Sequence, residues 1–169
     1  FVVYIAGDRD GIQTVTFWLM GSLANVSYRD VLLCAAIEIP CLAVAMILRW
    51  KMNLLSLDQE EARSLGINVK KLRLAVILIA TIMTAVTVSV CGIIGWIGLV
   101  IPHIARLLIG NDHRTLIPAS VLMGSIYLLL IDTAARAATA GEVPLSILTA
   151  MVGAPFFAVI LRKTSGGRE

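Results

Sequence analysis

The chain has 169 residues, of which 59% are apolar and 15% charged, and its mean hydropathy is +0.91. These values lie outside the norm for soluble domains, so we predict that lipid surrounds most of the chain. The net charge of +3 does not indicate nucleic-acid binding, because no basic stripe interleaved with stacking aromatic residues accompanies it. The three cysteines fit neither a zinc site nor a disulfide framework, and we interpret them as small packing residues: Cys34, Cys41 and Cys91.

The first residues of the chain lack the features expected at the N-terminus of a protein. The chain begins at Phe1 without an initiator methionine, and residues 1–6 form only a stub of apolar sequence, which we interpret as the end of a truncated span. The chain is therefore expected to be the C-terminal part of a longer protein. Residues 11–23 are too short to cross a bilayer, and Trp18 and Tyr28 suit a membrane interface, so a short helix on the outer side is predicted there. A plain extracellular loop is the alternative.

Five apolar segments follow, each close to the roughly 20 residues that a bilayer requires. An unsatisfied backbone group in lipid costs several kcal/mol, so these segments are expected to be helices even where β-branched residues are dense. The predicted fold class is an all-α polytopic transmembrane bundle that forms part of a single transmembrane domain. The spans are residues 31–48, 74–90, 93–109, 118–135 and 143–161.

The basic residues predict the orientation of these spans. If the spans alternate, all but three of the fourteen Lys and Arg residues fall on one side, and only Arg9, Arg29 and Arg136 fall on the other. The positive-inside rule then places the loops at residues 51–73 and 110–116, and the C-terminal tail, in the cytoplasm.

The loop at residues 54–66 is predicted to be a short amphipathic helix. Ser56 or Asp58 suits its N-cap, acidic residues occupy its first turn, and Gly66 suits the position just past its end. On its own such a helix is usually a solvated connection. The chain, however, lacks the nucleotide-binding pattern G-x-x-x-x-G-K-[ST], so a membrane protein of this kind needs a docking element if an external motor drives it.

The most specific string runs from Gly92 to Arg106. We predict that three glycines at a spacing of three leave one helix face without side chains, and that a proline interrupts the hydrogen-bond ladder. His103 has no second ligand nearby, so we interpret it as a hydrogen-bonding group near the inner surface and predict no metal site. The fifth span, opened by Pro144, is expected to line a cavity or shift during transport, with plain helix packing as the alternative. The helix-break and packing positions are Gly92, Gly95, Gly98, Pro102, Gly153 and Pro155.

Two further polar features lie in the apolar segments. Glu38 either marks a functional site or is a structural group satisfied by a hydroxyl or a proton, and we favour a place in the outer half of its span. Asp132 and Arg136 are spaced i, i+4 and are expected to pair near the outer surface. The arginine is thereby oriented toward a docking partner, unless it only snorkels.

Taken together, the motifs resemble the FecCD family of ABC-importer permeases, which carry iron–siderophore complexes, haem and cobalamin across the bacterial inner membrane. The likeness covers essentially the whole chain. Its pieces include residues 17–23, 53–57, 61–66, 95–106, 112–114, 116–118, 132–136, 142–144 and 153–157.

The resemblance implies a ten-helix protomer, of which this chain forms the end of span five, an outer helix and spans six to ten. It implies a multi-pass permease of the inner membrane that has no cofactor and no ATPase site of its own. Its partners would be a cytoplasmic ABC ATPase, an extracytoplasmic substrate-binding protein and a second permease copy, identical or paralogous. Arg136, with Asp132, is similar to the position that meets the binding protein. The loop at 54–66 would be the coupling helix, with ATPase-coupling residues Asp58, Glu60, Glu61, Ala62, Arg63 and Gly66.

Three positions depart from the family pattern, namely Asp58, Trp96 and Ser146. The cargo implied most often is an iron–siderophore complex, with cobalamin and haem as alternatives. A secondary transporter driven by an ion gradient has only Glu38 in its support and lacks obvious inverted repeats. An intramembrane hydrolase would need paired catalytic groups, and no Ser/His/Asp or His/Glu constellation is present in the sequence.

Overall fold

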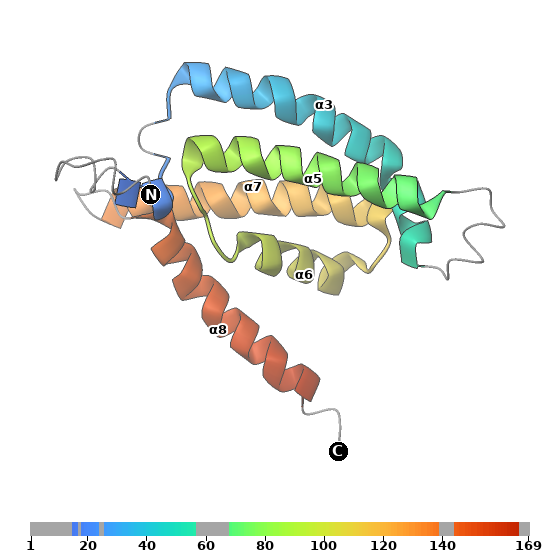
Figure 1. Cartoon of the computed structure of the whole chain (residues 1–169). Helices are drawn as coiled ribbons and strands as arrows, with labels where there is room; N and C mark the ends of the chain where they lie inside the picture. Colours follow the sequence, from blue (N-terminus) through green and yellow to red (C-terminus); the bar gives the residue numbers. More distant parts are fainter. Residues whose placement is uncertain (1–14, 17, 24–25, 57–67, 139–143, 166–169) are drawn as a thin grey trace. The chain divides into compact units, whose positions relative to one another are not determined.

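The structure is a computed structural model, and it describes residues 15–16, 18–23, 26–56, 68–138 and 144–165 (Figure 1). All regular structure in these residues is helical, which confirms the predicted all-α fold. Residues 15–16 and 18–19, within the predicted outer helix, are helical as well. The longer elements are α3 (Tyr28–Asn53), the 3₁₀ turn η1 (Leu54–Ser56), α5 (Val69–Cys91), α6 (Ile97–Ile109), α7 (His113–Ala138) and α8 (Leu145–Ser165).

Three helices are long and apolar enough to cross a membrane, at Tyr28–Asn53, Val69–Cys91 and His113–Ala137. A helix of 26 residues such as α3 is about 39 Å long, which exceeds a hydrocarbon core of about 30 Å. Two shorter apolar helices are found at Ile97–Ile109 and Leu145–Ala158. Each of the five predicted spans thus contains a helix, and α6, with 13 residues, is shorter than the roughly 20 residues that a bilayer requires.

Helices α3, α5 and α7 begin before the predicted apolar ranges, and at α3 and α5 a polar cap outside the apolar range sets the start. Ser27 and Asp30 form a capping box that starts α3 at Tyr28, before the predicted residue 31. Asn68 accepts hydrogen bonds from the backbone N–H of Lys71 and Leu72 at the start of α5, before the predicted residue 74.

The glycine run does not form one helix face, and that prediction is wrong. Gly92 follows the end of α5 with a φ of +71°, Trp96 has a φ of +67°, and α6 begins only at Ile97. Gly92 and Gly95 therefore precede the helix, and Gly98 alone lies within it. A glycine in the left-handed region just past a helix is a common way to end one, so the spacing of three reflects a cap and a turn. Pro102 and Pro155 lie inside α6 and α8 without ending them.

The chain divides into two compact units. Unit 1 comprises Phe1–Val26, Cys91–His103 and Gly124–Glu169, and unit 2 comprises Ser27–Val90 and Ile104–Met123. In unit 1, the N–H of Ser22 donates to the carbonyl of Cys91 (3.0 Å), and the N–H of Leu145 donates to the carbonyl of Gly21 (3.0 Å). Main-chain hydrogen bonds thus join three segments of unit 1 that are distant in sequence.

Candidate functional sites

A cluster of polar residues in unit 2 joins the end of α3 to the start of α7, and we call Arg49, Asn53, Asp112, His113 and Arg114 the Asn53 cluster. The side-chain oxygen of Asn53 accepts from the backbone N–H of His113 (2.8 Å) and lies 2.7 Å from Nδ1 of the same residue. The side-chain N–H of Asn53 donates to Oδ1 of Asp112 (2.6 Å). One amide therefore bonds two consecutive residues that lie 59 and 60 positions away in the sequence.

Chemistry fixes the orientation of this amide. A backbone N–H only donates, so the Asn53 atom that faces His113 must be the oxygen. A carboxylate only accepts, so the atom that faces Asp112 must be the nitrogen. The same logic puts the proton of a neutral His113 ring on Nδ1, because the amide oxygen cannot donate to it.

Asp112 is also the N-cap of α7. Its Oδ1 accepts from the backbone N–H of Arg114 (2.9 Å), and its carbonyl accepts from the N–H of Leu116 (2.8 Å). The Arg114 backbone N–H, followed by the Asn53 amide, holds the pKa of the Asp112 carboxyl below its ordinary value. The cap of α7 and the end of α3 thus depend on one carboxylate oxygen.

A second contact joins the same two helices. Pro118 has no N–H, so the carbonyl of Arg114, four residues earlier, has no helical donor. Nη1 of Arg49 donates to this carbonyl at 3.1 Å. The Arg114 guanidinium in turn lies 5.9 Å from the ring centroid of Trp50, within the range of a cation–π contact.

Glu38 has a hydroxyl partner, which is one of the alternatives that the sequence left open. Oγ1 of Thr87 lies 2.5 Å from Oε1 of Glu38 and 2.9 Å from the carbonyl of Met83. The contact joins α3 to α5 within two apolar helices of unit 2. A carboxyl group that faces a hydroxyl at this distance is a satisfied group.

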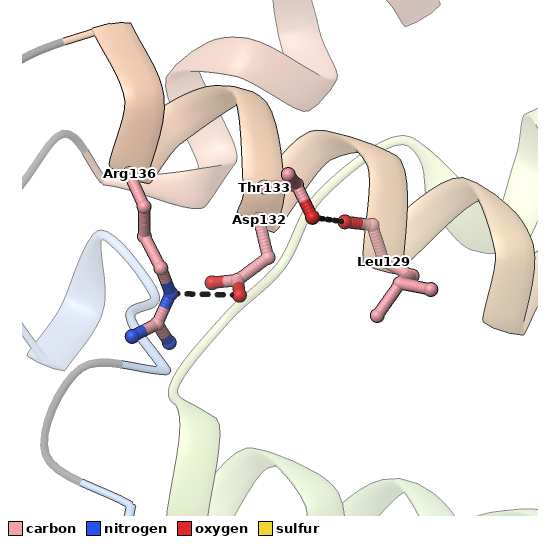
Figure 2. A network of polar contacts seen from close by, with 4 residues as sticks. All are labelled: Leu129, Asp132, Thr133 and Arg136. Atoms are coloured by element: carbon pink, nitrogen blue, oxygen red, sulfur yellow. Dashed lines mark hydrogen bonds and ion pairs between the residues drawn. The ribbon is translucent and has the colours of Figure 1, made fainter.

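In unit 1, Asp132 and Arg136 form the predicted ion pair on α7. Nε of Arg136 donates to Oδ2 of Asp132 at 2.8 Å, and Figure 2 shows the two side chains facing each other across one turn. The side chain of Arg136 is 62% exposed, whereas that of Asp132 is 23% exposed. Beside the pair, the hydroxyl of Thr133 donates to the carbonyl of Leu129 (2.7 Å). The Asp132 carboxylate therefore binds Nε of an exposed arginine side chain near the end of α7.

Close backbone approaches surround the break between α5 and α6. A Cβ built on Gly92 would overlap the carbonyl oxygen of Trp18, and a Cβ on Gly153 would lie 2.6 Å from the Cβ of Trp96. The Trp96 ring also meets Phe157 edge to face, with centroids 6.3 Å apart. In contrast, apart from adjacent residues and the helix's own backbone, no atom of the described residues lies within 4 Å of a Cβ built on Gly95 or Gly98. Close packing is thus seen at Gly92 and Gly153.

The predicted ATPase-coupling residues, Asp58, Glu60, Glu61, Ala62, Arg63 and Gly66, lie outside the described residues. Residues 54–56, where the predicted coupling helix begins, form the turn η1. Among the residues that the structure describes, no group of three or more His, Cys, Asp or Glu side chains is placed to hold a metal ion.

Sequence reasoning missed Asn53 and Arg49 as members of a site and missed Thr87 as the partner of Glu38. One local signal was available for the first site. An aspartate just before a helix predicts a cap, and a proline five residues into the helix predicts a carbonyl that needs an outside donor. The identity of the donor was not available from local pattern, because Arg49 lies 65 positions away.

Comparisons with known proteins give a consistent result. A model of the FecCD transport family matches residues 1–163. The chain is 40% identical over 164 residues to the molybdate import system permease protein MolB of Haemophilus influenzae, which covers 97% of this chain and 49% of that protein. It is 44% identical over 155 residues to a protein of Helicobacter pylori named "Probable iron chelatin transport system permease protein", which covers 91% of this chain and 47% of that protein. The chain thus spans about half the length of these relatives.

A solved structure is similar as well. It shows a metal-chelate type ABC transporter in an inward-facing conformation, and the TM-score is 0.90 at 41% sequence identity. The superposition covers 95% of this chain and 52% of that chain.

Proposed function

This chain belongs to the FecCD transport family, and from that premise we propose that it is part of the permease subunit of an ABC importer for an iron–siderophore complex. The family match over residues 1–163 is the observation that carries the proposal. Three helices of spanning length support a multi-pass protein of the bacterial inner membrane. ATP would be hydrolysed in a partner subunit.

The cargo is tested separately from the family. The relatives described above are named for molybdate and for an iron chelatin. Cobalamin and haem are the alternatives that the sequence leaves open. Uptake of each labelled cargo by cells that contain the whole importer, with the cognate binding protein, distinguishes them. We expect the iron chelate to be imported and molybdate to be excluded.

The permease would act mechanically and carry out no chemistry itself. The loop at residues 54–66 would dock on a cytoplasmic ATPase, and ATP energy would shift the population between inward-open and outward-open states through differential contacts at this loop. The excess of basic residues at one end of the helices supports a cytoplasmic position for this loop and for the C-terminus. A second permease copy would complete the pathway.

On the opposite side, Arg136 would meet a carboxylate of the binding protein. Two observations support this role: the side chain of Arg136 is exposed, and its Nε is bonded to the Asp132 carboxylate (Figure 2). Charged groups at the rim of an interface mainly set the encounter rate and the specificity. Arg136→Glu is expected to weaken binding of the loaded binding protein by about tenfold. Arg29→Glu, the same charge change at an exposed arginine on the same proposed side, is the matched control.

The proposal is tested by the ATPase activity of the full-length permease with its ATPase in lipid nanodiscs, with and without loaded binding protein. Glu60→Ala/Glu61→Ala/Arg63→Ala is expected to lose stimulated turnover or assembly of the complex. Lys70→Ala/Lys71→Ala/Arg73→Ala removes three charges outside the loop and serves as the control. Normal assembly and turnover in the first variant would remove the coupling role from this loop.

An importer driven by an ion gradient is the alternative that the intramembrane Glu38 suggests, although the contact of this carboxyl with the Thr87 hydroxyl weakens its support. An ionophore that collapses the gradient separates the two candidates. Import that continues with ATP after the collapse supports the ABC importer, whereas import that stops supports the second candidate.

A further inference from the structure

We infer that Asn53 is a positioning residue that couples movement of the proposed docking loop to α7. This inference rests on the proposed function, because it requires that a partner ATPase acts on the loop at residues 54–66. Asn53 is the last residue of α3, and the chain passes from it directly into η1 and that loop. A force on the loop therefore reaches α3 at Asn53.

The contacts of Asn53 direct such a force toward α7. Both polar atoms of its amide are used, the oxygen by His113 and the nitrogen by Asp112. These two residues are the first residue and the N-cap of α7. The end of α3 cannot move away from α7 without breaking at least two hydrogen bonds.

Arg49 supplies a second contact one turn earlier on α3. Its guanidinium bonds the Arg114 carbonyl that Pro118 leaves without a helical donor. Because a helix is stiff along its axis, contacts at both Arg49 and Asn53 resist rotation of the end of α3 as well as its translation. The same helix, α7, carries the Asp132–Arg136 pair near its other end. One element thus holds both the Asn53 cluster and the proposed docking arginine.

Asn53→Asp tests this role with the loss of one N–H donor and almost no change in shape. The new carboxylate still accepts from His113, but it faces the Asp112 carboxylate across the former 2.6 Å contact, where neither side can donate. Asp112→Asn is different, because the amide oxygen can still accept from both Asn53 and Arg114. Asn111→Asp adds the same charge at a neighbouring exposed position and is the matched control.

The experiment measures cargo imported per ATP hydrolysed by the full-length permease, its ATPase and its loaded binding protein in proteoliposomes. We expect Asn53→Asp to lower this ratio about tenfold with normal assembly, and Asp112→Asn and Asn111→Asp to stay within about twofold of wild type. Asn53→Asp/Asp112→Asn removes the facing charges, but one amide atom at position 112 cannot both donate to the new carboxylate and accept from Arg114. We therefore expect partial recovery, to about threefold above Asn53→Asp alone.

Several outcomes would overturn the inference. They are an unchanged import ratio in Asn53→Asp, a loss of ATPase binding together with import, and a double variant no better than Asn53→Asp. If Asn53→Asp does not fold, Arg49→Gln removes only the second contact, and an unchanged ratio there overturns the inference. A wild-type permease that neither binds the ATPase nor imports cargo would overturn the proposed function and this inference with it. A wild type that imports normally confines any failure to the role of Asn53.

Discussion

In unit 1 several segments meet through backbone groups, whereas in unit 2 the contacts described between elements are side-chain hydrogen bonds. Gly21 bonds Leu145 through backbone groups, and Gly92 leaves room for the carbonyl of Trp18. In unit 2, Asn53 and Thr87 bond partners on other elements through their side chains. A backbone approach of this kind tolerates no added Cβ, whereas a side-chain bond can be kept by an isostere. A small change in side-chain size should therefore lower the free energy of unfolding much more in unit 1 than in unit 2.

Gly92→Ala is expected to have the largest effect. An alanine at a φ of +71° is strained, and its Cβ would overlap the Trp18 carbonyl oxygen. Strain and overlap together are expected to cost about 3 kcal/mol or more. Thermal unfolding of the purified protein in detergent measures this loss. Gly98→Ala is the control, since its Cβ would meet no described atom within 4 Å other than those of adjacent residues and its own helix backbone, and alanine favours a helix. Equal melting temperatures in the two variants would contradict the comparison.

Gly153→Ala is expected to cause the second largest loss of stability. Its Cβ would lie 2.6 Å from the Cβ of Trp96 and 2.9 Å from its Cγ, so the tryptophan would have to shift. Such overpacking costs about 1–3 kcal/mol. Trp96→Gly relieves both the crowding and the positive φ, although it loses the ring contact with Phe157. The double variant should therefore be less destabilised than the sum of the single variants, and simple additivity would show that the two sites do not press on each other.

The difference between the two units also explains what the sequence could predict. Apolar length located the five helical segments, and the i, i+4 spacing located the Asp132–Arg136 pair, because both signals are local. The glycine run was misread because a spacing of three fits a helix, whereas Gly92 ends α5 in the left-handed region and Trp96 has a positive φ just before α6.

The hydrogen-bond partners in unit 2 could not be predicted from local sequence pattern, for a different reason. Asn53 and Asp112 are separated by 59 positions, and Glu38 and Thr87 by 49 positions. Hydrophobic periodicity tells which residues share a helix face but not which faces meet. The caps at Ser27, Asn68 and Asp112 explain the shifted helix starts, since a polar residue outside the apolar range determines where each helix begins.

A smaller effect is expected when the α3–α5 bond is removed in unit 2. Hydrogen bonds between membrane helices contribute on average about 0.6 kcal/mol, so Thr87→Val should cost roughly that amount. Glu38→Gln should cost less, because its amide N–H can donate to Thr87 Oγ1 while that hydroxyl donates to the Met83 carbonyl. Thr84→Val removes a hydrogen bond within α5 only and is the matched control. Unfolding titrations in mixed micelles measure these differences. A loss in Thr87→Val as large as that in Gly92→Ala would break the comparison between the units.

The smallest effect is expected from the pH dependence of Asp112, which is fully exposed to solvent. The N–H of Arg114 and the amide of Asn53 lower the pKa of this carboxyl in the folded protein. Its stabilising contribution is therefore complete above the ordinary pKa of about 3.9 and is lost as the pH falls through the lowered folded value. Asp112→Asn cannot titrate, so the melting temperatures of wild type and variant should converge as the pH falls from neutral to about 3. High salt should reduce the initial difference, because exposed charges are screened. A difference that stays constant over this pH range would mean that the carboxylate charge contributes nothing, and that the bonds of Asn53 act through shape alone.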